Sequence, residues 1–572
     1  MTKVLNVEER PLINVHGLHV AVAGNDKRLI LDDINLCVQR RTVLGIVGES
    51  GSGKSTLALT MLGYLKPGLQ RVSGRVLIDK CDVMSAPETE LRELRRRAVG
   101  YVPQNAGFSL TPTKRIGSLI EELLWIDGTH SAVQIRARVN ELLRSVSLPS
   151  EIASRYPHQL SGGQQQRCAI AMAIAGRADL LVLDEPTSAL DATTHNELLA
   201  LLRTLVDERS LTIVCVTHDM RVVSRLCSHV AVMHEGKVVE NGNADQVLRT
   251  PQHPYTQTLL KAQPSWRSQR GLQSQTTHAQ SGTATNALDI RDLTVRFSRR
   301  SLLSQLWLSS RLDEGSPAIQ DITFAVQTGK IVGVVGESGS GKSTLLKSIA
   351  GATSAQRGQI LLMNSQDLAQ LKSRSLDLRQ KVQLVWQNPL AAVNPRQSVF
   401  EAIDAPLRLY FNLSNAKRRA RAIELLGMVQ LTSDYLDRLP SELSGGQAQR
   451  VAIARACAAE PAIMLCDEIT SALDLSVQAA VLDVIRSIRA QTGCTFLFVS
   501  HDLAVVSSIA DEIIVLHKGR ICESGTTEKV LINPAHPYTQ SLIDAFHDAA
   551  EIGFERESGA NGLRRPMGSY AC

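Results

Sequence analysis

The motif GESGSGKST spans residues 48–56 and recurs letter for letter at residues 336–344. The two copies are 288 positions apart, and later matched pairs such as Gln104 and Gln387 are 283 positions apart. One order of motifs written twice predicts a duplicated domain. At 572 residues the chain is also too long for one ordinary core. We therefore expect two tandem domains of the same architecture.

Continuous apolar runs recur in both copies and predict strands that are buried on both faces. They lie at residues 43–47, 180–183 and 212–216, and again at 331–335, 463–466 and 495–499. Helical stretches separate them. This alternation is typical of an α/β domain with a largely parallel sheet.

The repeated motif has the GxxxxGKS pattern of a phosphate-binding loop between a strand and a helix. Its backbone N–H groups surround a phosphate chain, its lysine reaches the β/γ oxygens, and its serine ligates magnesium. The loop residues expected to contact nucleotide are Gly48, Ser50, Gly51, Gly53, Lys54, Ser55 and Thr56 in copy one, and Gly336, Ser338, Gly339, Gly341, Lys342, Ser343 and Thr344 in copy two.

Two apolar runs end in a pair of acids, LLVLDE at 180–185 and IMLCDE at 463–468. The carboxyl end of a buried parallel strand is where α/β sheets bind ligands. The first acid of each pair, Asp184 or Asp467, suits magnesium held through water. The second, Glu185 or Glu468, suits a general base that polarises the attacking water.

The segments LSGGQQQR at 160–167 and LSGGQAQR at 443–450, here called the signature segments, each precede an Ala/Ile-rich helical stretch. Ser161, Gly162 and Gly163, with Ser444, Gly445 and Gly446, then form a second candidate anion site at a helix N-terminus. A capping serine followed by a glycine turn is the alternative interpretation.

With Gln104 and Gln387 upstream and His218 and His501 downstream, this order of motifs closely resembles the ATP-binding subunits of ABC transporters. The resemblance implies two tandem ABC-type P-loop domains, each with a parallel-sheet core, a small antiparallel sheet and a helical subdomain. It also implies an intramolecular head-to-tail dimer that binds ATP and Mg²⁺ between the phosphate loop of one half and the signature segment of the other.

By motif, one composite site combines Lys54, Ser55, Gln104, Asp184, Glu185 and His218 with Ser444, Gly445 and Gly446. The other combines Lys342, Ser343, Gln387, Asp467, Glu468 and His501 with Ser161, Gly162 and Gly163. In this assignment Glu185, Glu468, His218 and His501 are catalytic, and Ser55, Gln104, Asp184, Ser343, Gln387 and Asp467 hold magnesium. SALD at 188–191 and 471–474 resembles the family's D-loop. Both sites are expected to hydrolyse ATP.

Each copy ends in a related motif, PQHPYT at 251–256 and PAHPYT at 534–539. A Pro-initiated helix start explains it physically, but its recurrence resembles the oligopeptide, dipeptide and nickel importer subfamily in its fused, glutathione- and microcin-type form. The resemblance implies uptake of peptides or a related solute through two separate permeases with a solute-binding protein. Residues 257–287 and 540–571 contain no cysteine, so we expect no iron–sulfur cluster.

Composition and charge exclude several other classes of protein. The net charge of +6 is small for this length and does not indicate nucleic-acid binding. We find no membrane-spanning run and no secretory leader, and expect a peripheral protein at the cytoplasmic face of the inner membrane. A soluble tandem ATPase acting on ribosomes is the main alternative. Its usual long charged linker differs from the Gln/Ser/Thr-rich segment here. A DNA-repair ATPase is a third possible class of protein.

The expected domains are residues 1–261 and 288–548, joined by a flexible linker at 262–287 and followed by a disordered tail at 549–572. Residues 298–316 are interpreted as an extended loop. Two positions depart from the family pattern. Ile469 stands where the family usually has proline, and Phe297 can stack on adenine in copy two, whereas Val22 occupies the matching place in copy one.

Overall fold

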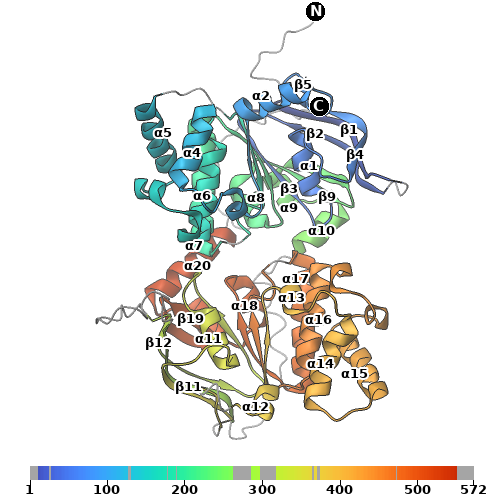
Figure 1. The fold of residues 1–572 in the computed structure, drawn as a ribbon, viewed down its shortest axis with the longest axis vertical. Coiled ribbons are helices and arrows are strands. Elements are labelled where there is room, and N and C mark those ends of the chain that lie inside the picture. Colours follow the sequence, from blue (N-terminus) through green and yellow to red (C-terminus); the bar gives the residue numbers. More distant parts are fainter. Residues whose placement is uncertain are drawn as a thin grey trace, which may run out of the picture. The chain divides into compact units, whose positions relative to one another are not determined.

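The computed structural model describes residues 11–24, 28–126, 131–176, 178–188, 190–261, 285–296, 317–363, 366–369, 374–471 and 473–550. Within it the chain forms two compact units, the first containing residues 11–261 and the second residues 285–546 (Figure 1). Phe297, the expected loop at 298–316, residues 262–284 of the expected linker and residues 551–572 of the expected tail lie outside the described residues.

Each unit contains a six-stranded sheet, which is parallel except for one edge strand. In the first unit the order is β10-β9-β3-β8-β7-β6. These strands are β3 (Val43–Val47), β6 (Val99–Val102), β7 (Leu180–Asp184), β8 (Thr212–Val216), β9 (His229–His234) and β10 (Lys237–Asn243). In the second unit the equivalent strands are β13 (Ile331–Val335), β16 (Val382–Val385), β17 (Ile463–Asp467), β18 (Thr495–Val499), β19 (Glu512–His517) and β20 (Arg520–Thr526). All six strands expected from apolar runs are confirmed.

A four-stranded antiparallel sheet accompanies each parallel sheet, as the resemblance implied. In the first unit it contains β1 (Ile13–Val22), β2 (Leu29–Val38), β4 (Leu69–Ile78) and β5 (Cys81–Asp82). In the second it contains β11 (Asn286–Val295), β12 (Ile319–Gln327), β14 (Arg357–Leu362) and β15 (Gln366–Asp367).

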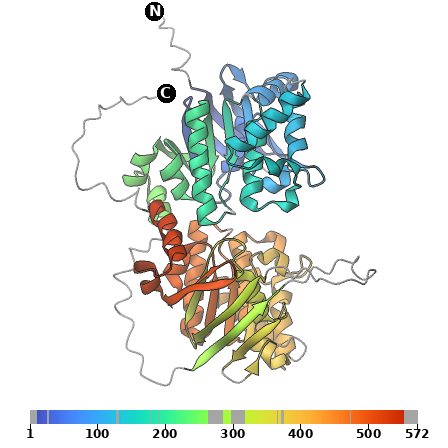
Figure 2. The same ribbon diagram turned by 90° about the vertical axis from the view of Figure 1, so that its left-hand side faces the viewer.

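The helices repeat in the same order in both units. Those of the first unit are α1 (Lys54–Met61), α2 (Glu88–Ala98), α3 (Ala106–Ser109), α4 (Ile116–Ile126), α5 (Ala132–Ser145), α6 (Gly162–Ala173), α7 (Ala192–Arg209), α8 (Met220–Leu226), α9 (Ala244–Arg249) and α10 (Pro254–Lys261). Those of the second are α11 (Lys342–Ala350), α12 (Leu376–Lys381), α13 (Pro389–Ala392), α14 (Val399–Tyr410), α15 (Asn415–Met428), α16 (Gly445–Cys457), α17 (Leu475–Thr492), α18 (Leu503–Ile509), α19 (Thr527–Ile532) and α20 (Pro537–Ala550). Figures 1 and 2 both show the α4–α6 group and the α14–α16 group standing beside the strands of their own unit.

The parallel strands are apolar throughout because their two faces belong to different cores. In β7, Leu180 and Val182 pack with the antiparallel sheet and α1, whereas Leu181 and Leu183 pack with the helical group. Alternate side chains of a strand point to opposite faces, so burial on both sides requires a continuous apolar run. The strand β17 divides its side chains between two cores in the same way.

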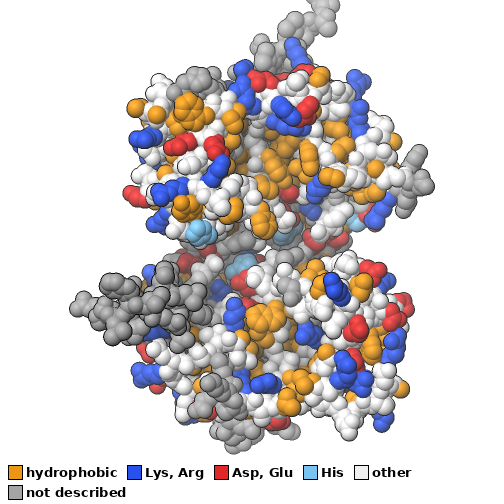
Figure 3. Space-filling model, in the orientation of Figure 1, with side chains coloured by type: hydrophobic (Ala, Val, Ile, Leu, Met, Phe, Trp, Pro, Cys, Tyr) orange, Lys and Arg blue, Asp and Glu red, His pale blue; other side chains and the backbone are white. Residues whose placement is uncertain are grey.

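Two expected domain limits differ from the described elements by two residues. The strand β11 already begins at Asn286, because Asn286 pairs with Gln327 of β12, and α20 continues to Ala550. Backbone pairing of a polar residue leaves no apolar pattern in the sequence, so the limit at 288 was set too late. No described helix combines the length and apolarity needed to cross a bilayer. On the face drawn in Figure 3, basic and acidic side chains are interspersed.

Candidate nucleotide-binding and hydrolysis site

Each phosphate loop connects a buried strand, β3 or β13, to the first turn of α1 or α11. Glycine is needed where the loop begins. A Cβ on Gly48 would lie 2.1 Å from the carbonyl oxygen of Met233, and one on Gly336 would lie 2.1 Å from that of Leu516. The helix caps Gly53 and Gly341 have φ angles of 98° and 104°, a region that favours glycine. Only a residue without a side chain therefore fits these positions of the turn.

The loop lysines are buried and fold back over the loop. The Nζ of Lys54 donates to the carbonyl oxygens of Gly48 at 2.8 Å and Glu49 at 2.6 Å. The Nζ of Lys342 makes the equivalent bonds to Gly336 and Glu337, both at 2.8 Å. A buried ammonium group among backbone N–H groups creates a positive site that suits a phosphate chain.

The second serine of each loop has an unsatisfied hydroxyl. Ser52 is 5% exposed and Ser340 is 4% exposed, and neither Oγ has a hydrogen-bond partner among the described residues. Buried polar atoms are nearly always paired, so an unpaired hydroxyl inside a phosphate loop fits a site that a ligand completes. The motif pattern indicated the exposed Ser50 and Ser338 as nucleotide contacts, and not these two serines.

The first acid of each pair lies against the loop serine. The Oγ of Ser55 donates to Asp184 at 3.0 Å, and the Oγ of Ser343 donates to Asp467 at 2.9 Å. Burial raises the pKa of Asp184 above its ordinary value, although the Ser55 hydrogen bond acts in the opposite direction. The same holds for Asp467 and Ser343. A hydroxyl and a buried carboxylate are oxygen ligands of the kind magnesium prefers, so these residues fit the expected metal.

The second acid of each pair contacts a glutamine predicted to hold magnesium and a histidine predicted to be catalytic. The Nε2 of Gln104 donates to Glu185 at 2.6 Å, and the Nδ1 of His218 lies 3.3 Å from the same carboxylate. The residues Gln387, Glu468 and His501 repeat this arrangement at 3.0 Å and 3.5 Å. The structure therefore brings together residues that are far apart in the sequence.

Hydrogen bonding to the histidine keeps the second acid ionised. Burial acts to raise the pKa of Glu185, but the hydrogen bond and the charge of His218 lower it below its ordinary value. For Glu468 the hydrogen bond to His501 is the largest influence, and the pKa is again lowered. An ionised carboxylate beside the magnesium ligands is suited to accept a proton from water.

The missing proline in the second copy does not change this turn. Glu185 precedes Pro186 and has a φ of 49°, and Glu468 precedes Ile469 and has a φ of 48°. The N–H groups of the two glutamates bond to Val216 and Val499 at the ends of β8 and β18. Pairing with the neighbouring strand therefore holds the glutamate in the same left-handed conformation in both units.

The signature segments begin α6 and α16 with a capping box. The Oγ of Ser161 accepts the N–H of Gln164 at 3.3 Å, and the side chain of Gln164 accepts the N–H of Ser161 at 3.1 Å. Ser444 and Gln447 do the same at 3.3 Å and 2.9 Å. Within each unit the serine thus acts as a helix cap. Its expected role at a nucleotide requires the opposite unit and stays a prediction.

The two signature glycines have different surroundings. A Cβ on Gly163 would lie 2.4 Å from Thr194 of α7, and one on Gly446 would lie 2.1 Å from Val477 of α17. In contrast, a Cβ on Gly162 would meet no atom within 4 Å. The second glycine is therefore required for helix packing, whereas the first leaves the start of α6 open.

We expect Gly163→Ala to lower the stability of the first unit by about 1–3 kcal/mol because it overpacks the contact with α7. Gly162→Ala serves as the matched control and should change stability by less than about 1 kcal/mol. Thermal unfolding of both full-length variants without nucleotide tests the difference. Equal unfolding temperatures would contradict the packing role of Gly163.

The HPYT motifs also contact the phosphate loops, and no pattern in the sequence predicted this contact. The hydroxyl oxygen of Tyr255 accepts the N–H of Glu49 at 3.0 Å, and that of Tyr538 accepts the N–H of Glu337 at 3.0 Å. The only signal in the sequence was that the motif recurs at the same place in both copies.

Comparison with known proteins matches both halves of the chain to one family. The ABC transporter family matches residues 31–188 and 319–471. A second family, described as the C-terminal region of oligopeptide/dipeptide transporters, matches residues 239–289 and 522–559. The second match contains the HPYT motif of each copy.

Relatives of known function resemble the chain over nearly its whole length. The glutathione import ATP-binding protein GsiA of Shigella dysenteriae serotype 1 (strain Sd197) is 35% identical, covering 93% of this chain and 89% of that protein. The GsiA protein of Salmonella typhimurium LT2 is 34% identical, covering 94% and 90%. Among solved structures, the dimeric post-hydrolysis state of the ATP-binding cassette MJ0796 bound to ADP and Pi is 31% identical and covers 41% of this chain and 98% of that chain, with a TM-score of 0.38. This protein belongs to the ABC transporter family.

Proposed function

We propose that this protein is the ATP-hydrolysing, energy-coupling subunit of an ABC importer for peptides or a related small solute. The observation that carries the proposal is the cluster found in each unit, where a loop lysine, a serine–aspartate pair and an ionised glutamate lie at the carboxyl ends of neighbouring strands. Because both units contain the glutamate and its histidine, both are proposed to hydrolyse ATP to ADP and phosphate.

The residues of one unit have distinct roles in this reaction. Lys54 and the loop N–H groups bind the phosphate chain, Ser55 and Asp184 hold Mg²⁺, and Glu185 takes a proton from the attacking water. Magnesium supplies charge stabilisation on the phosphate oxygens when it is bound. Gln104 and His218 orient the carboxylate of Glu185, because both bond to it. Lys342, Ser343, Gln387, Asp467, Glu468 and His501 have the same roles in the second unit.

A complete site also needs the signature segment of the opposite unit. We propose that Ser444, Gly445 and Gly446 complete the site of the first unit, and that Ser161, Gly162 and Gly163 complete the site of the second. The open surface at Gly162 supports this assignment, because a ligand can approach the start of α6 without a clash. The expected domain limits at 1–261 and 288–548, apart from the strand and helix ends given above, stay predictions.

The proposed partners are two permease chains and a solute-binding protein, with this chain at the cytoplasmic face of the inner membrane. The family match to oligopeptide/dipeptide transporters and the glutathione import relatives favour this assignment over the ribosome-acting ATPase. No iron–sulfur cluster and no nucleic acid are part of the proposal. The solute class rests on the relatives.

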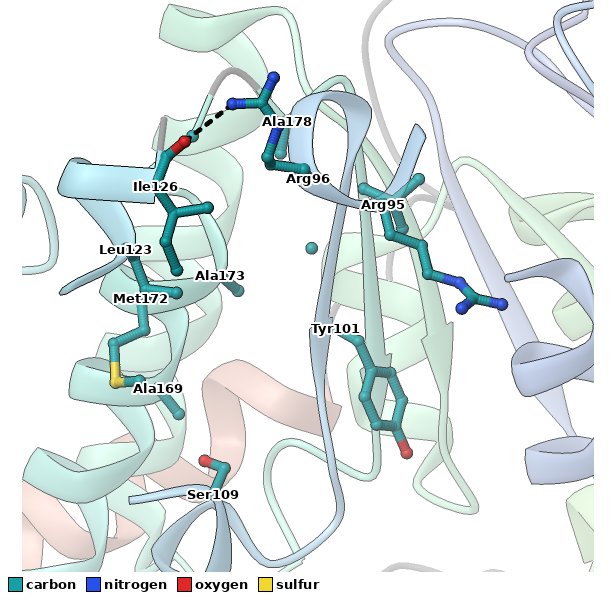
Figure 4. A pocket seen from close by; sticks show the side chains of 13 residues that line it. Arg95, Arg96, Tyr101, Ser109, Leu123, Ile126, Ala169, Met172, Ala173 and Ala178 are labelled. Atoms are coloured by element: carbon teal, nitrogen blue, oxygen red, sulfur yellow. Dashed lines mark hydrogen bonds between the residues drawn. The ribbon is translucent and has the colours of Figure 1, made fainter. Parts of the chain in front are cut away.

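A hollow of about 270 Å³, lined by Tyr101, Ser109 and Leu123 among others, is the proposed place of a permease contact on the first unit. Figure 4 shows it between β6, α4 and α6, with Arg96 bonded to the carbonyl oxygen of Ile126 at its rim. Exposed apolar side chains lie on the adjoining elements α3 and α4, where Phe108 is 90% exposed and Ile126 is 62% exposed. We propose that these two side chains take part in the permease contact.

We expect a tagged Glu185→Gln, Glu468→Gln chain, trapped with ATP, to co-purify two permease chains from detergent-solubilised membranes of its native host. Adding Phe108→Asp should reduce the recovered permeases at least about tenfold, because a charge enters an apolar contact. Val133→Asp is the matched control, since Val133 is 78% exposed on α5. Phe108→Asp in the otherwise native chain should leave basal ATPase activity within about twofold.

Two outcomes would contradict these assignments. Recovery of ribosomes without permeases would refute the importer and leave only the ATPase chemistry. Equal permease recovery with Phe108→Asp and Val133→Asp would refute the contact at this hollow while leaving the importer assignment intact.

A further inference from the structure

The tyrosine of each HPYT motif contacts the first peptide of the phosphate loop in its own unit, although the two are far apart in the sequence. The hydroxyl of Tyr255 accepts the N–H of Glu49, 206 positions earlier in the chain, at 3.0 Å. Tyr538 and Glu337 make the same bond across 201 positions, also at 3.0 Å. The repetition of one contact in two units of different sequence indicates that it has a role in both.

Each tyrosine is held firmly by its neighbours. The ring of Tyr255 stacks on His234, the last residue of β9, with centroids 3.9 Å apart. Its N–H donates to the Nδ1 of His253 at 3.2 Å, so the histidine of the motif caps the helix that the proline begins. In the second unit the ring of Tyr538 lies against that of His517, with centroids 3.9 Å apart and a tilt of 33°. The N–H of Tyr538 donates to the Nδ1 of His536 at 3.1 Å.

A half-buried glutamate anchors the start of the motif to the sheet. The carboxylate of Glu240, on β10, accepts the N–H groups of Gln252 at 2.8 Å and His253 at 3.0 Å. Glu523, on β20, accepts those of Ala535 at 2.8 Å and His536 at 3.0 Å. Two N–H bonds to one carboxylate define the position of the turn, and with it the direction of the tyrosine.

The hairpin formed by β9 and β10, and its equivalent formed by β19 and β20, also contact the phosphate loop directly. The N–H of Gly236, in the turn between β9 and β10, donates to the carbonyl oxygen of Ser52 at 3.2 Å. Gly519 and Ser340 do the same at 3.0 Å. Together with the tyrosine bond, this contact supports the loop at its first peptide and at the serine whose hydroxyl has no partner within the described part of the chain.

We propose that Tyr255 and Tyr538 are positioning residues that hold the phosphate loops in the conformation that binds nucleotide. The HPYT region then contributes to the affinity of each site for ATP. The inference rests on the proposed ATPase function. A loop already held in its binding conformation loses less conformational freedom when ATP binds. Removing the hydroxyl leaves the N–H of Glu49 or Glu337 without its acceptor and frees the start of the loop.

We expect Tyr255→Phe with Tyr538→Phe, in the full chain, to raise the KM for ATP about 5–30-fold, the range expected for one lost hydrogen bond to a partly buried group. The turnover number should change less than about threefold, because the tyrosines do not contact the reacting atoms. Hydrogen exchange of the peptides covering residues 43–57 and 331–345 should rise at least about fivefold without nucleotide. Each single variant should affect only its own loop.

Tyr410→Phe, at the end of α14, is the matched control and should change neither quantity. A KM within twofold of wild type, or unchanged exchange at the two loops, overturns the proposal. A rise in exchange spread over both units also overturns it, because the hydroxyls would then serve global stability. Absence of ATP hydrolysis by the wild-type chain would refute the proposed function instead.

Discussion

Replacing Glu185 and Glu468 together by glutamine should reduce ATP turnover by about 10²–10⁴-fold, the usual contribution of a general base. Both carboxylates have a lowered pKa and are ionised at neutral pH. Glutamine has the same shape and can still bond to Gln104 or Gln387, but it accepts no proton. The Kd for ATP should therefore stay within about threefold of wild type. Steady-state hydrolysis and equilibrium binding of ATP measure the two effects separately.

The control for this variant is Glu88→Gln, because Glu88 lies on α2 and makes an exposed ion pair with Arg92. It should retain full turnover. The single variants Glu185→Gln and Glu468→Gln also show whether the sites act independently, in which case each keeps about half the activity, or together, in which case each loses nearly all of it. A double variant that retains hydrolysis within tenfold of wild type would contradict the assignment of the base.

Replacing Asp184 and Asp467 by asparagine should have opposite effects on activity and on stability. Turnover should fall at least about 100-fold, since the charge that holds Mg²⁺ is lost. Without nucleotide, however, the variant should unfold at a higher temperature, by roughly 2–4 °C for each kcal/mol gained in units of this size. The reason is that burial penalises the ionised carboxylates, whose pKa is raised in the folded protein.

The pH dependence tests this explanation. A carboxylate with a raised folded pKa binds its proton more tightly when folded, so its penalty is absent below the unfolded pKa and complete above the folded pKa. The difference in unfolding temperature between variant and wild type should therefore be largest at neutral pH and shrink as the pH falls toward 4. Adding Mg²⁺ and ATP should stabilise the wild type more than the variant. A variant that is less stable than wild type at pH 7 would contradict the account.

Much of the fold could be read from the sequence because its strongest signals are local. A strand such as β7 is buried on both faces and has no polar residue until Asp184, which marks its end. The limits at Asn286 and Ala550 were missed, because strand pairing and the last turn of a helix involve backbone groups that any residue supplies.

The motifs predicted individual site residues and their roles. The structure shows Ser55 bonded to Asp184 and Gln104 bonded to Glu185, whereas the roles of these residues stay predictions. The hydroxyl of Ser52, which has no partner among the residues that the structure describes, was not predicted. Whether a serine of the loop points outward or inward depends on the path of the neighbouring strands. The sequence shows two candidate serines, and only the structure distinguishes the exposed Ser50 from the buried Ser52.

By itself, the sequence determined the duplication, the parallel strands, the phosphate loops and the order of the acid pairs and signature segments. These depend on residue type and spacing within short stretches, where a few bonds define the conformation. The tertiary structure alone decided which distant groups meet: Gln104 with Glu185, Gly163 with Thr194, and Tyr255 with Glu49. Such contacts follow from the order of strands in the sheet, which brings together chain segments that no local pattern connects.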